Sequence, residues 1–302
     1  MRTLVIISGK GGTGKTTVAG VFASLANATA IGDCDVDAPD FHLILNPSIK
    51  TQKDFYGLSK AKIDSERCTA CLQCSKICRF DAIQQNGIKI QVNPLMCEGC
   101  RACGLVCPED AIYYVDTVVG EVYLSDSRYA PLSHAQLKIG EENSGKLVGE
   151  VREQLKEISR AIKNPLIILD GPPGIGCPVI SSITGATAVL IVTEPSVSGG
   201  SDMERALALI EHFQMKGFVL LNKADLNPKE VARIRNVCEK RNVEIIGEIP
   251  FDETVSRAIS NGHTLLEENP NASASLALIN AWEVMSSHLK QVIQSSTSNE
   301  TS

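Results

Sequence analysis

Length, composition and charge already exclude several classes of protein. The chain has 302 residues, 43% of them hydrophobic, which is enough to bury a large core in one or two domains. A formal net charge of −6 gives no electrostatic reason to bind nucleic acid. No apolar run approaches the roughly 18 residues that span a membrane, and the start "MRTLVIISGKGG" is unlike a signal peptide. We expect a cytoplasmic protein without nucleic-acid partners or stable membrane association.

Six short, near-continuously apolar runs predict strands that are covered on both faces. Helix-like segments lie between the later runs, at 147–162, 199–213 and 228–240, and this alternation is typical of an α/β fold with a mostly parallel sheet. The carboxyl ends of such strands form the ligand-binding edge. The runs are "TLVIIS" from Thr3, "ATAIGDCD" from Ala28, "PLIILDG" from Pro165, "AVLIVTEP" from Ala188, "GFVLLNKAD" from Gly217 and "VEIIGEIP" from Val243.

The first run leads into "GKGGTGKTT", a glycine-rich loop that precedes a helix-like segment. This context predicts a phosphate-binding loop, in which backbone N–H groups and the helix N-terminus face the phosphates. Lys15 is expected to reach the β- and γ-phosphates, and Thr16 to bind Mg²⁺. The expected nucleotide contacts are Gly9, Lys10, Gly11, Gly12, Thr13, Gly14, Lys15, Thr16 and Thr17.

Lys10, five residues before Lys15, makes this loop resemble the deviant Walker A motif of the MinD/ParA-type ATPases. That class includes Mrp-like cluster carriers and the nitrogenase iron protein, and its extra lysine contacts nucleotide across a dimer interface. The resemblance implies a P-loop NTPase fold and catalytic roles for Lys10 and Lys15. It also implies a nucleotide-dependent dimer, formed either by two copies of the chain or with a related ATPase.

Two acidic segments resemble the switches of the same class. "GDCDVDAP" resembles switch I, in which Asp35 is implied to orient the attacking water and Asp33 to support Mg²⁺. "DGPPG" resembles switch II, in which Asp170 is implied to hold Mg²⁺ through water. Carboxylates at strand ends beside a phosphate loop suit phosphoryl transfer, where positioning and charge neutralisation supply most of the catalysis.

The segment "NKAD", 222–225, resembles the base-reading motif of GTPases, but an asparagine here contacts adenine in MinD-type proteins. The resemblance therefore favours ATP over GTP and implies that Asn222, Lys223 and Asp225 bind nucleotide. The alternative is that Asn222 and Asp225 only cap the following helix. "IPFDETV" is implied to line the base pocket through Pro250.

Eight of the eleven cysteines lie in an internal repeat, and disulfides are not expected in a reducing compartment. "CTACLQCSKICRFDAI" from Cys68 and "CEGCRACGLVCPEDAI" from Cys97 match at four cysteines and a closing Asp-Ala-Ile, at an offset of 29 residues. A duplicated unit is thus inserted into the α/β domain. The following "YYVDTVVGEVYLSDS" predicts a hairpin, and Cys34, Cys177 and Cys238 have no predicted ligand role.

Each run resembles the bacterial ferredoxin pattern, in which three cysteines hold one 4Fe–4S cluster and the fourth reaches the other cluster. Zinc is the alternative, although structural zinc sites usually pair two Cys-x-x-Cys units. Arg79 stands where the second run has Pro108, and a cation there is expected to raise the potential of one cluster. The implied ligands are Cys68, Cys71, Cys74 and Cys107 for one cluster, and Cys97, Cys100, Cys103 and Cys78 for the other.

The expected domains are an ATPase domain in two parts, 1–62 and 116–294, an inserted ferredoxin domain, 63–115, and a disordered tail, 295–302. The expected cofactors are ATP, Mg²⁺ and two 4Fe–4S clusters. Together these features favour an ATPase that gates electron transfer to an unidentified redox partner. The alternatives are an Mrp-type cluster carrier or scaffold and a MinD-like positioning ATPase. For the last, the stripe Leu278, Trp282, Met285 and Leu289 is better suited to packing on the sheet than to binding membrane.

Overall fold

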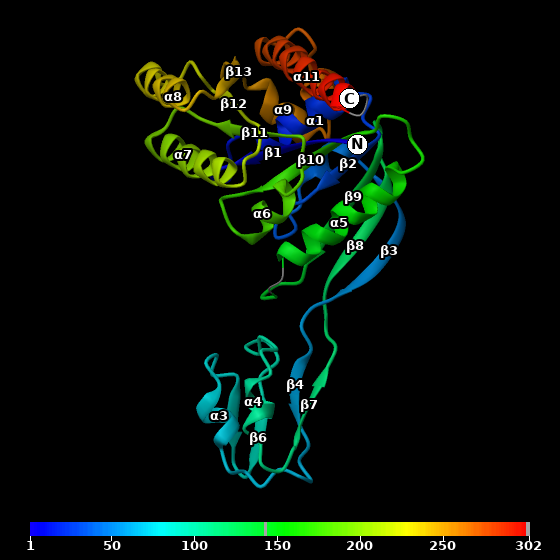
Figure 1. Cartoon of the computed structure of the whole chain (residues 1–302), viewed down its shortest axis with the longest axis vertical. Coiled ribbons are helices and arrows are strands. Elements are labelled where there is room, and N and C mark those ends of the chain that lie inside the picture. The colour runs from blue at the N-terminus through cyan, green and yellow to red at the C-terminus, as the bar shows by residue number, and fades with distance from the viewer. Residues whose placement is uncertain (142–143, 300–302) are drawn as a thin grey trace. The chain divides into compact units, whose positions relative to one another are not determined.

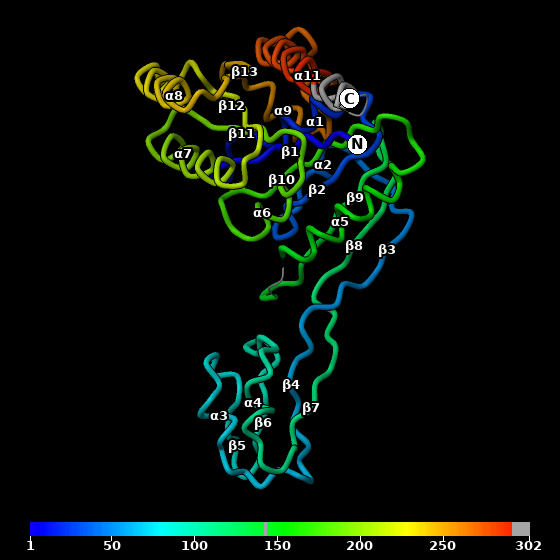
Figure 2. The backbone as a smooth tube through the Cα atoms, in the orientation of Figure 1, coloured from blue at the N-terminus to red at the C-terminus, as the bar shows by residue number. Residues whose placement is uncertain are grey.

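The computed structural model describes residues 1–141 and 144–299, with the backbone alone for 292–299. The chain divides into two compact units (Figure 1). Unit 1 comprises Met1–Gln52, Val122–Gln136 and the residues from Ser144 onward, and unit 2 comprises Lys53–Glu121 and residues 137–143. The chain passes from one unit to the other within two long strands, β3 and β8, and at the end of a third, β9 (Figure 2).

Unit 1 is built on a nine-stranded sheet, and all six predicted apolar runs form strands of it. The neighbouring pairs from β13 to β9 are parallel. Their carboxyl ends therefore meet at one edge, as in other open α/β sheets. In spatial order the strands are β13 (Glu244–Ile249), β12 (Gly217–Asn222), β11 (Ala188–Thr193), β1 (Arg2–Ser8), β10 (Leu166–Pro173), β2 (Ala30–Asp33), β9 (Pro131–Leu137), β8 (Val118–Asp126) and β3 (Ser48–Tyr56).

Helices cover both faces of this sheet (Figure 1). Helices α1 (Lys15–Leu25) and α11 (Ser273–Asn299) pack on one face, and α5 (Ser144–Ser159), α6 (Cys177–Ile183) and α7 (Val197–His212) on the other. Helix α8 (Pro228–Lys240) packs on α7 and β13. The short helices are α2 (Phe41–Leu45), α9 (Thr254–Ser260) and α10 (Leu265–Glu268).

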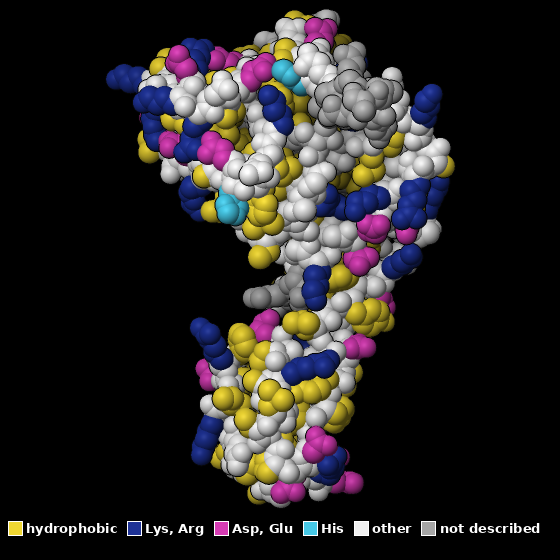
Figure 3. Space-filling model, viewed as in Figure 1, with side chains coloured by type: hydrophobic (Ala, Val, Ile, Leu, Met, Phe, Trp, Pro, Cys, Tyr) yellow, Lys and Arg dark blue, Asp and Glu magenta, His cyan; other side chains and the backbone are white. Residues whose placement is uncertain are grey.

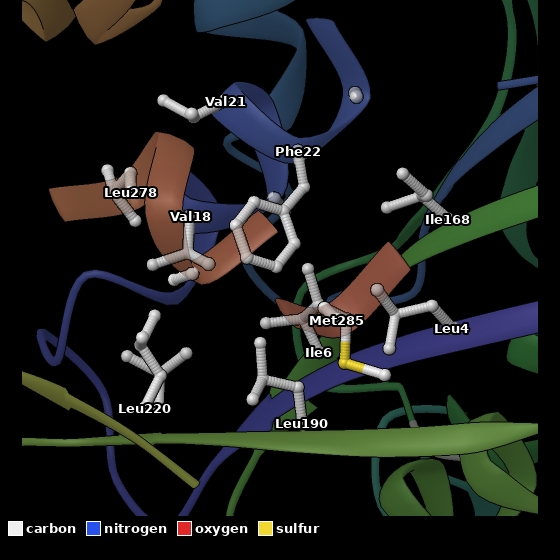
Figure 4. Close-up of a cluster of buried hydrophobic side chains, with 14 of the residues drawn as sticks. Leu4, Ile6, Val18, Val21, Phe22, Ile168, Leu190, Leu220, Leu278 and Met285 are labelled. Carbon is white, nitrogen blue, oxygen red and sulfur yellow. The ribbon is translucent and has the colours of Figure 1, made fainter. Parts of the chain in front are cut away.

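The core beneath α1 and α11 explains the apolar periodicity of the C-terminal helix. Phe22 of α1 packs among strand residues such as Ile6 and against Met285 of α11 (Figure 4). Its ring also lies 5.1 Å, between centroids, from that of Trp282. Complete burial of a side chain of this size contributes about 1.5–3 kcal/mol. The predicted packing of the stripe on the sheet is confirmed, since Leu278, Met285 and Leu289 are buried in this core.

Basic side chains on unit 1 are interspersed with acidic ones on the face drawn in Figure 3. On α8, Arg233 pairs with Glu204 at 3.1 Å and Arg235 pairs with Glu248 at 2.7 Å. The charges of these two arginines are thus neutralised locally by carboxylates. No helix among the described residues is long and apolar enough to cross a membrane.

Unit 2 consists of two repeats that interlock. Strand β4 (Lys60–Ile63), helix α3 (Gln73–Ile77) and strand β5 (Ile83–Asn86) recur as β6 (Lys89–Val92), α4 (Ala102–Leu105) and β7 (Ile112–Val115). Strand β4 pairs with β7 and β5 pairs with β6, so each two-stranded sheet takes one strand from each repeat. The small core follows the same symmetry, because its members pair at the offset of the duplication: Ala61 with Ile90, Cys74 with Cys103 and Ile83 with Ile112.

The hairpin predicted over residues 113–127 is wrong. Strand β7 pairs with β4 in unit 2, whereas β8 joins the nine-stranded sheet between β9 and β3. The duplication explains the difference, since β7 must complete the sheet begun by the first repeat. The two strands are joined by only Asp116 and Thr117, where the chain changes sheets.

The compact units differ in extent from the segments expected from sequence. Unit 2 extends beyond 63–115 and includes the loop after β9, where Glu141 pairs with the buried Lys60 at 2.7 Å. The Lys60 amine also donates to Pro94 O at 2.7 Å, so this loop is tied to both repeats. Helix α11 runs to Asn299, into the expected tail at 295–302, and residues 300–302 lie outside the described residues.

Candidate functional site

A cleft of about 680 Å³ opens in unit 1 at the carboxyl ends of the parallel strands. It brings together segments that are far apart in the sequence: the phosphate loop, the acidic segment after β2, and the loops after β12 and β13. Of the residues expected at the site, Gly11, Gly12, Thr13, Gly14, Lys15, Thr16, Thr17, Asp35, Asn222, Lys223 and Pro250 line it. The lining of this cleft does not include the other expected site residues, Gly9, Lys10, Asp33, Asp170 and Asp225.

The phosphate loop needs glycine at two closely packed positions. Gly14 immediately precedes α1 with φ of 91°, in the left-handed region that favours glycine. A Cβ on Gly14 would also lie 2.4 Å from Asn222 Nδ2. A Cβ on Gly9 would lie 2.4 Å from Asp202 Cβ. The loop is therefore held in one path by β12 and α7, with its N–H groups available for phosphate oxygens.

Lys15 is buried among carboxylates at the start of α1. Its Nζ lies 2.8 Å from Asp170 Oδ1 and 3.8 Å from Asp35 Oδ2. Burial alone would lower the pKa of Lys15, but Asp170, Asp33 and Asp35 raise it above its usual value. The amine therefore remains protonated in the cleft and supplies a fixed positive charge for phosphates.

Three aspartates concentrate negative charge around Lys15, and two of them, Asp33 and Asp170, are buried. Asp33 is buried and accepts hydrogen bonds from the backbone N–H groups of Asp35, at 3.0 Å, and Phe41, at 3.1 Å. Asp170 Oδ2 is buried and has no hydrogen-bond partner in the part of the chain that the structure describes. Burial raises the pKa of Asp33 and of Asp170, and raises that of Asp35 to about 6 despite the opposing charge of Lys15. A hard cation such as Mg²⁺ would use the unpartnered oxygen and stabilise the charged carboxylates.

Asp40 is a cleft residue that the sequence reasoning missed. Thr16 Oγ1, the expected Mg²⁺ ligand, donates to Asp40 Oδ1 at 3.1 Å. Asp40 lies five residues after Asp35 and immediately precedes α2. Its place in the acidic run "GDCDVDAPD" was the available signal.

Lys10 is held away from the cleft by Glu194, which the sequence reasoning also missed. Lys10 Nζ lies 2.7 Å from Glu194 Oε1 and donates to Ser196 Oγ and Ser198 Oγ at the start of α7, at 3.2 and 3.0 Å. The other oxygen of Glu194 lies 3.1 Å from Lys223 Nζ. Burial opposes ionisation of Glu194, but the hydrogen bonds from both lysines lower its pKa.

The end of β12 and the residues after it contact two other parts of the cleft, the phosphate loop and the loop after β13. Asn222 Nδ2 donates to Thr13 O at 2.7 Å, and Asp225 Oδ1 accepts from Phe251 N at 2.7 Å. The alternative that Asn222 and Asp225 cap the next helix is wrong, because the N-cap of α8 is Asn227. Asn222 thus links the end of β12 to the phosphate loop.

Unit 2 contains two cavities, each lined by four of the repeat cysteines. Each cavity takes three cysteines from one repeat and the last cysteine of the other. The exposure of the cysteines repeats as well: Cys74 and Cys103 are buried, whereas Cys71 and Cys100 are exposed. One cavity is lined by Cys68, Cys71, Cys74 and Cys107, and the other by Cys78, Cys97, Cys100 and Cys103.

The backbone between these cysteines adopts a costly conformation at matching positions. Ala70 and Leu72 have φ of 54° and 61°, and their counterparts Gly99 and Arg101 have 65° and 64°. Left-handed backbone at non-glycine residues persists only where the surroundings enforce it, and it is frequent at ligand-binding sites. Backbone N–H groups also donate to sulfur, from Ala61 to Cys97 Sγ at 3.5 Å and from Ala111 to Cys107 Sγ at 3.3 Å.

The remaining cysteines lie outside these cavities. Cys34 and Cys238 are buried, and burial raises the pKa of each thiol. Cys177 is exposed at the start of α6. Across the described ranges, no three His, Cys, Asp or Glu side chains converge closely enough to hold a single metal ion.

The fold and the loop at the cleft define a P-loop nucleotide-binding protein. Residues 4–265 match the family described as the CobQ/CobB/MinD/ParA nucleotide binding domain, and the chain belongs to this family. The chain therefore carries a nucleotide-binding domain of the MinD/ParA type.

Two relatives and one solved structure are similar to this chain over most of its length. Protein MJ0578 of Methanocaldococcus jannaschii, whose function is uncharacterized, is 34% identical over 277 residues, 90% of this chain and 93% of that protein. Protein MJ0579 of the same organism is 24% identical over 275 residues, 89% and 93% of the two chains. The structure of septum site-determining protein MinD from Pyrococcus horikoshii, complexed with Mg-ADP, shares the fold with a TM-score of 0.57 and 17% identity over 93% and 94% of the chains.

Proposed function

We propose that this ATPase is an iron–sulfur protein in which the nucleotide state controls electron transfer. The observation that carries the proposal is the arrangement of the repeat cysteines: each cavity is lined by three cysteines of one repeat and the last cysteine of the other. This is how two 4Fe–4S clusters are held in bacterial ferredoxins. When bound, each cluster would supply a one-electron redox centre, and the cavity cysteines would be its thiolate ligands.

The chemistry of the donor sets favours clusters over zinc. A structural zinc site draws four thiolates to about 2.3 Å from one point. Such sites usually pair two Cys-x-x-Cys units, whereas each cavity here combines three cysteines spaced three residues apart in one repeat with the last cysteine of the other, which is the ligand set of a four-iron cluster. The N–H groups that donate to Cys97 and Cys107 are a further feature that tunes such sites.

At the nucleotide cleft, this chain's own residues account for phosphoryl transfer. Lys15 carries the charge for the β- and γ-phosphates, and Thr16, Asp33 and Asp170 would hold Mg²⁺. Asp35 lines the cleft beside Lys15, where it would orient the attacking water. Asn222, Lys223 and Pro250 would border the adenine, and Asp225 fixes the loop that carries Pro250.

Coupling between the two sites is supported by the path of the chain. Strand β2 ends at Asp33 and pairs with β9, from Ile31 to Leu132 and from Gly32 to Ser133. The chain enters unit 2 at two places. One is the end of β9, and the other lies within β3, which begins eight residues after Asp40. Switch segments of NTPases become ordered around γ-phosphate and Mg²⁺ and are released after hydrolysis. Nucleotide-dependent movement at Asp33 and Asp35 would therefore act on strands that continue into unit 2.

We further propose that ATP brings two such ATPase domains together, with Lys10 of each reaching the nucleotide of the other. Lys10 is poised for this change, since its present partners are side chains at the start of α7 rather than the cleft. The partner domain belongs to a second copy of the chain or to a related ATPase.

The test is an anaerobic redox titration followed by EPR, with ATP, ADP or no nucleotide. The proposal predicts that ATP changes the midpoint or the line shape of a cluster signal, and that Lys15→Ala removes the change while the clusters remain. Cluster signals that are identical in all three nucleotide states would contradict the gating.

A second candidate, a cluster carrier or scaffold, is favoured by the exposure of Cys71 and Cys100. An accessible ligand in each set would let an acceptor thiolate attack. Incubation with an apo-ferredoxin separates the candidates: a carrier loses its clusters to the acceptor, faster with ATP, whereas an electron-transfer protein retains them. A MinD-like positioning role has only the family in its favour, because the apolar stripe of α11 is buried in the core.

A further inference from the structure

The two cysteine cavities differ in their surroundings, although the duplication makes their cysteines equivalent. Residues of the second repeat lie 29 positions after their counterparts, as Cys97 does after Cys68. Each contact at one cavity therefore has a defined counterpart at the other.

The first difference is a hydroxyl group beside one buried sulfur. Tyr114 Oη lies 4.0 Å from Cys103 Sγ and 3.1 Å from Arg101 O, so the single proton of the hydroxyl can be donated to either acceptor, and a thiolate at Cys103 can only accept it. Gly104 makes room for it, because a Cβ there would lie 2.3 Å from Tyr114 Oη. The counterpart of Tyr114 is Gln85, whose amide donates to Gly87 O at 3.0 Å within its own turn.

The second difference is a cation. Arg101 lines the cavity of Cys103, and its guanidinium carbon lies 4.9 Å from the centre of the Tyr114 ring. Its counterpart Leu72 lines the other cavity. The backbones of the two residues match, with φ of 64° and 61°, so only the side chains differ.

Other charges at the cavities do not cancel this difference. One glutamate lines each cavity, Glu109 that of Cys74 and Glu98 that of Cys103, so the charges of the two linings differ by that of Arg101. Arg79, expected to distinguish the clusters, lines neither cavity, whereas Arg101, which is also exposed, lines one of them.

We propose that Tyr114 and Arg101 make the two sites electronically unequal, so that the cluster held by Cys78, Cys97, Cys100 and Cys103 has the higher reduction potential. This inference rests on the proposed iron–sulfur function. Reduction adds negative charge to a cluster, and a hydrogen-bond donor or a cation near its sulfurs stabilises the reduced form. In a singly reduced chain, the electron then resides at the site beside Tyr114.

The test is an EPR-monitored redox titration of the anaerobically purified full chain and two variants. Tyr114→Phe removes the hydroxyl and keeps the ring, and Arg101→Leu installs the residue that the first repeat accommodates in the same backbone conformation. The wild type is expected to show two midpoints. Each variant is expected to lower the higher midpoint and leave the lower one in place. Gln85→Leu is the matched control and is expected to move neither midpoint.

Iron content and thermal unfolding of each variant show that the sites are loaded and the fold retained. Midpoints that stay in place in Tyr114→Phe and Arg101→Leu overturn the inference, as does an equal shift in Gln85→Leu. Absence of iron from the wild-type chain would contradict the proposed function itself, whereas two loaded clusters with one shared midpoint would contradict this inference alone.

Discussion

Lys10 Nζ lies 2.7 Å from Glu194 Oε1, and the same carboxylate binds Lys223 through its other oxygen. A carboxylate between two lysines stabilises both in their present positions. In the proposed dimer, Lys10 must leave Glu194 to reach the nucleotide of the partner domain. The Lys10–Glu194 ion pair is therefore expected to oppose formation of this dimer.

Glu194→Gln is expected to strengthen ATP-dependent self-association. A partly exposed ion pair contributes about 0.2–1 kcal/mol, and a symmetric dimer must release two of them, so the dissociation constant of the dimer should fall roughly two- to thirtyfold. Analytical ultracentrifugation with a non-hydrolysable ATP analogue measures this. Glu204→Gln, which removes one carboxylate partner of Arg233 and leaves Glu230, is the control and should leave association unchanged. Weaker association of Glu194→Gln would show that this glutamate stabilises the dimer instead.

Asp170→Asn is expected to abolish Mg²⁺-dependent hydrolysis while preserving the fold. Asparagine has nearly the same shape but removes the charge that faces Lys15 and would hold Mg²⁺. Loss of a preorganised group of this kind costs about 10²–10³-fold in rate. Phosphate release at saturating ATP is the measurement. Asp126→Asn, which removes only an exposed pair with Lys50, is the control. Near-wild-type hydrolysis by Asp170→Asn would exclude Asp170 from the metal site.

Asn222→Ala distinguishes support of the phosphate loop from recognition of the base. Its amide donates to Thr13 O, and loss of a partly buried hydrogen bond costs about 1–3 kcal/mol. We therefore expect weaker binding of ATP and GTP by roughly tenfold or more, with their ratio unchanged. Asn227→Ala, which removes the cap of α8, should lower stability without changing either affinity. A changed ratio of ATP to GTP affinity would instead assign base reading to Asn222.

The crossed cysteine sets predict which serine variants affect the same cluster. Cys107→Ser should alter the EPR signal that Cys71→Ser alters, and Cys78→Ser should alter the signal that Cys100→Ser alters, because each pair shares a cavity. If each cluster were held by one repeat alone, Cys107→Ser would instead alter the same signal as Cys100→Ser, and Cys78→Ser the same signal as Cys71→Ser. Should Cys107→Ser instead modify the signal affected by Cys100→Ser, the crossed arrangement is wrong.

Much of the fold could be predicted because it depends on burial. Strands such as β1 and β11 are covered on both faces, so their sequences are continuously apolar. Strand β3 was not predicted, since all its side chains except that of Phe55 are exposed. It occupies the edge of the sheet, where Lys50 and Lys53 are typical of a strand that avoids further pairing.

Parts of the sites could not be predicted, for a different reason. The phosphate loop and the cysteine runs have fixed local spacings, which the sequence displays directly. Glu194 and Tyr114 carry no such signal, because their roles depend on contacts with residues brought near by the fold, Lys10 for Glu194 and Cys103 for Tyr114. The hairpin expected at 113–127 was wrong for a related reason, as pairing of β7 with β4 depends on the symmetry of the duplication.

The most direct test of the central claim is the metal content of the anaerobically purified chain. Two four-iron clusters require about eight iron atoms and as many labile sulfides per chain, with an EPR signal that appears on reduction. A folded chain that hydrolyses ATP but contains stoichiometric zinc, or neither iron nor sulfide after cluster reconstitution, would contradict the claim.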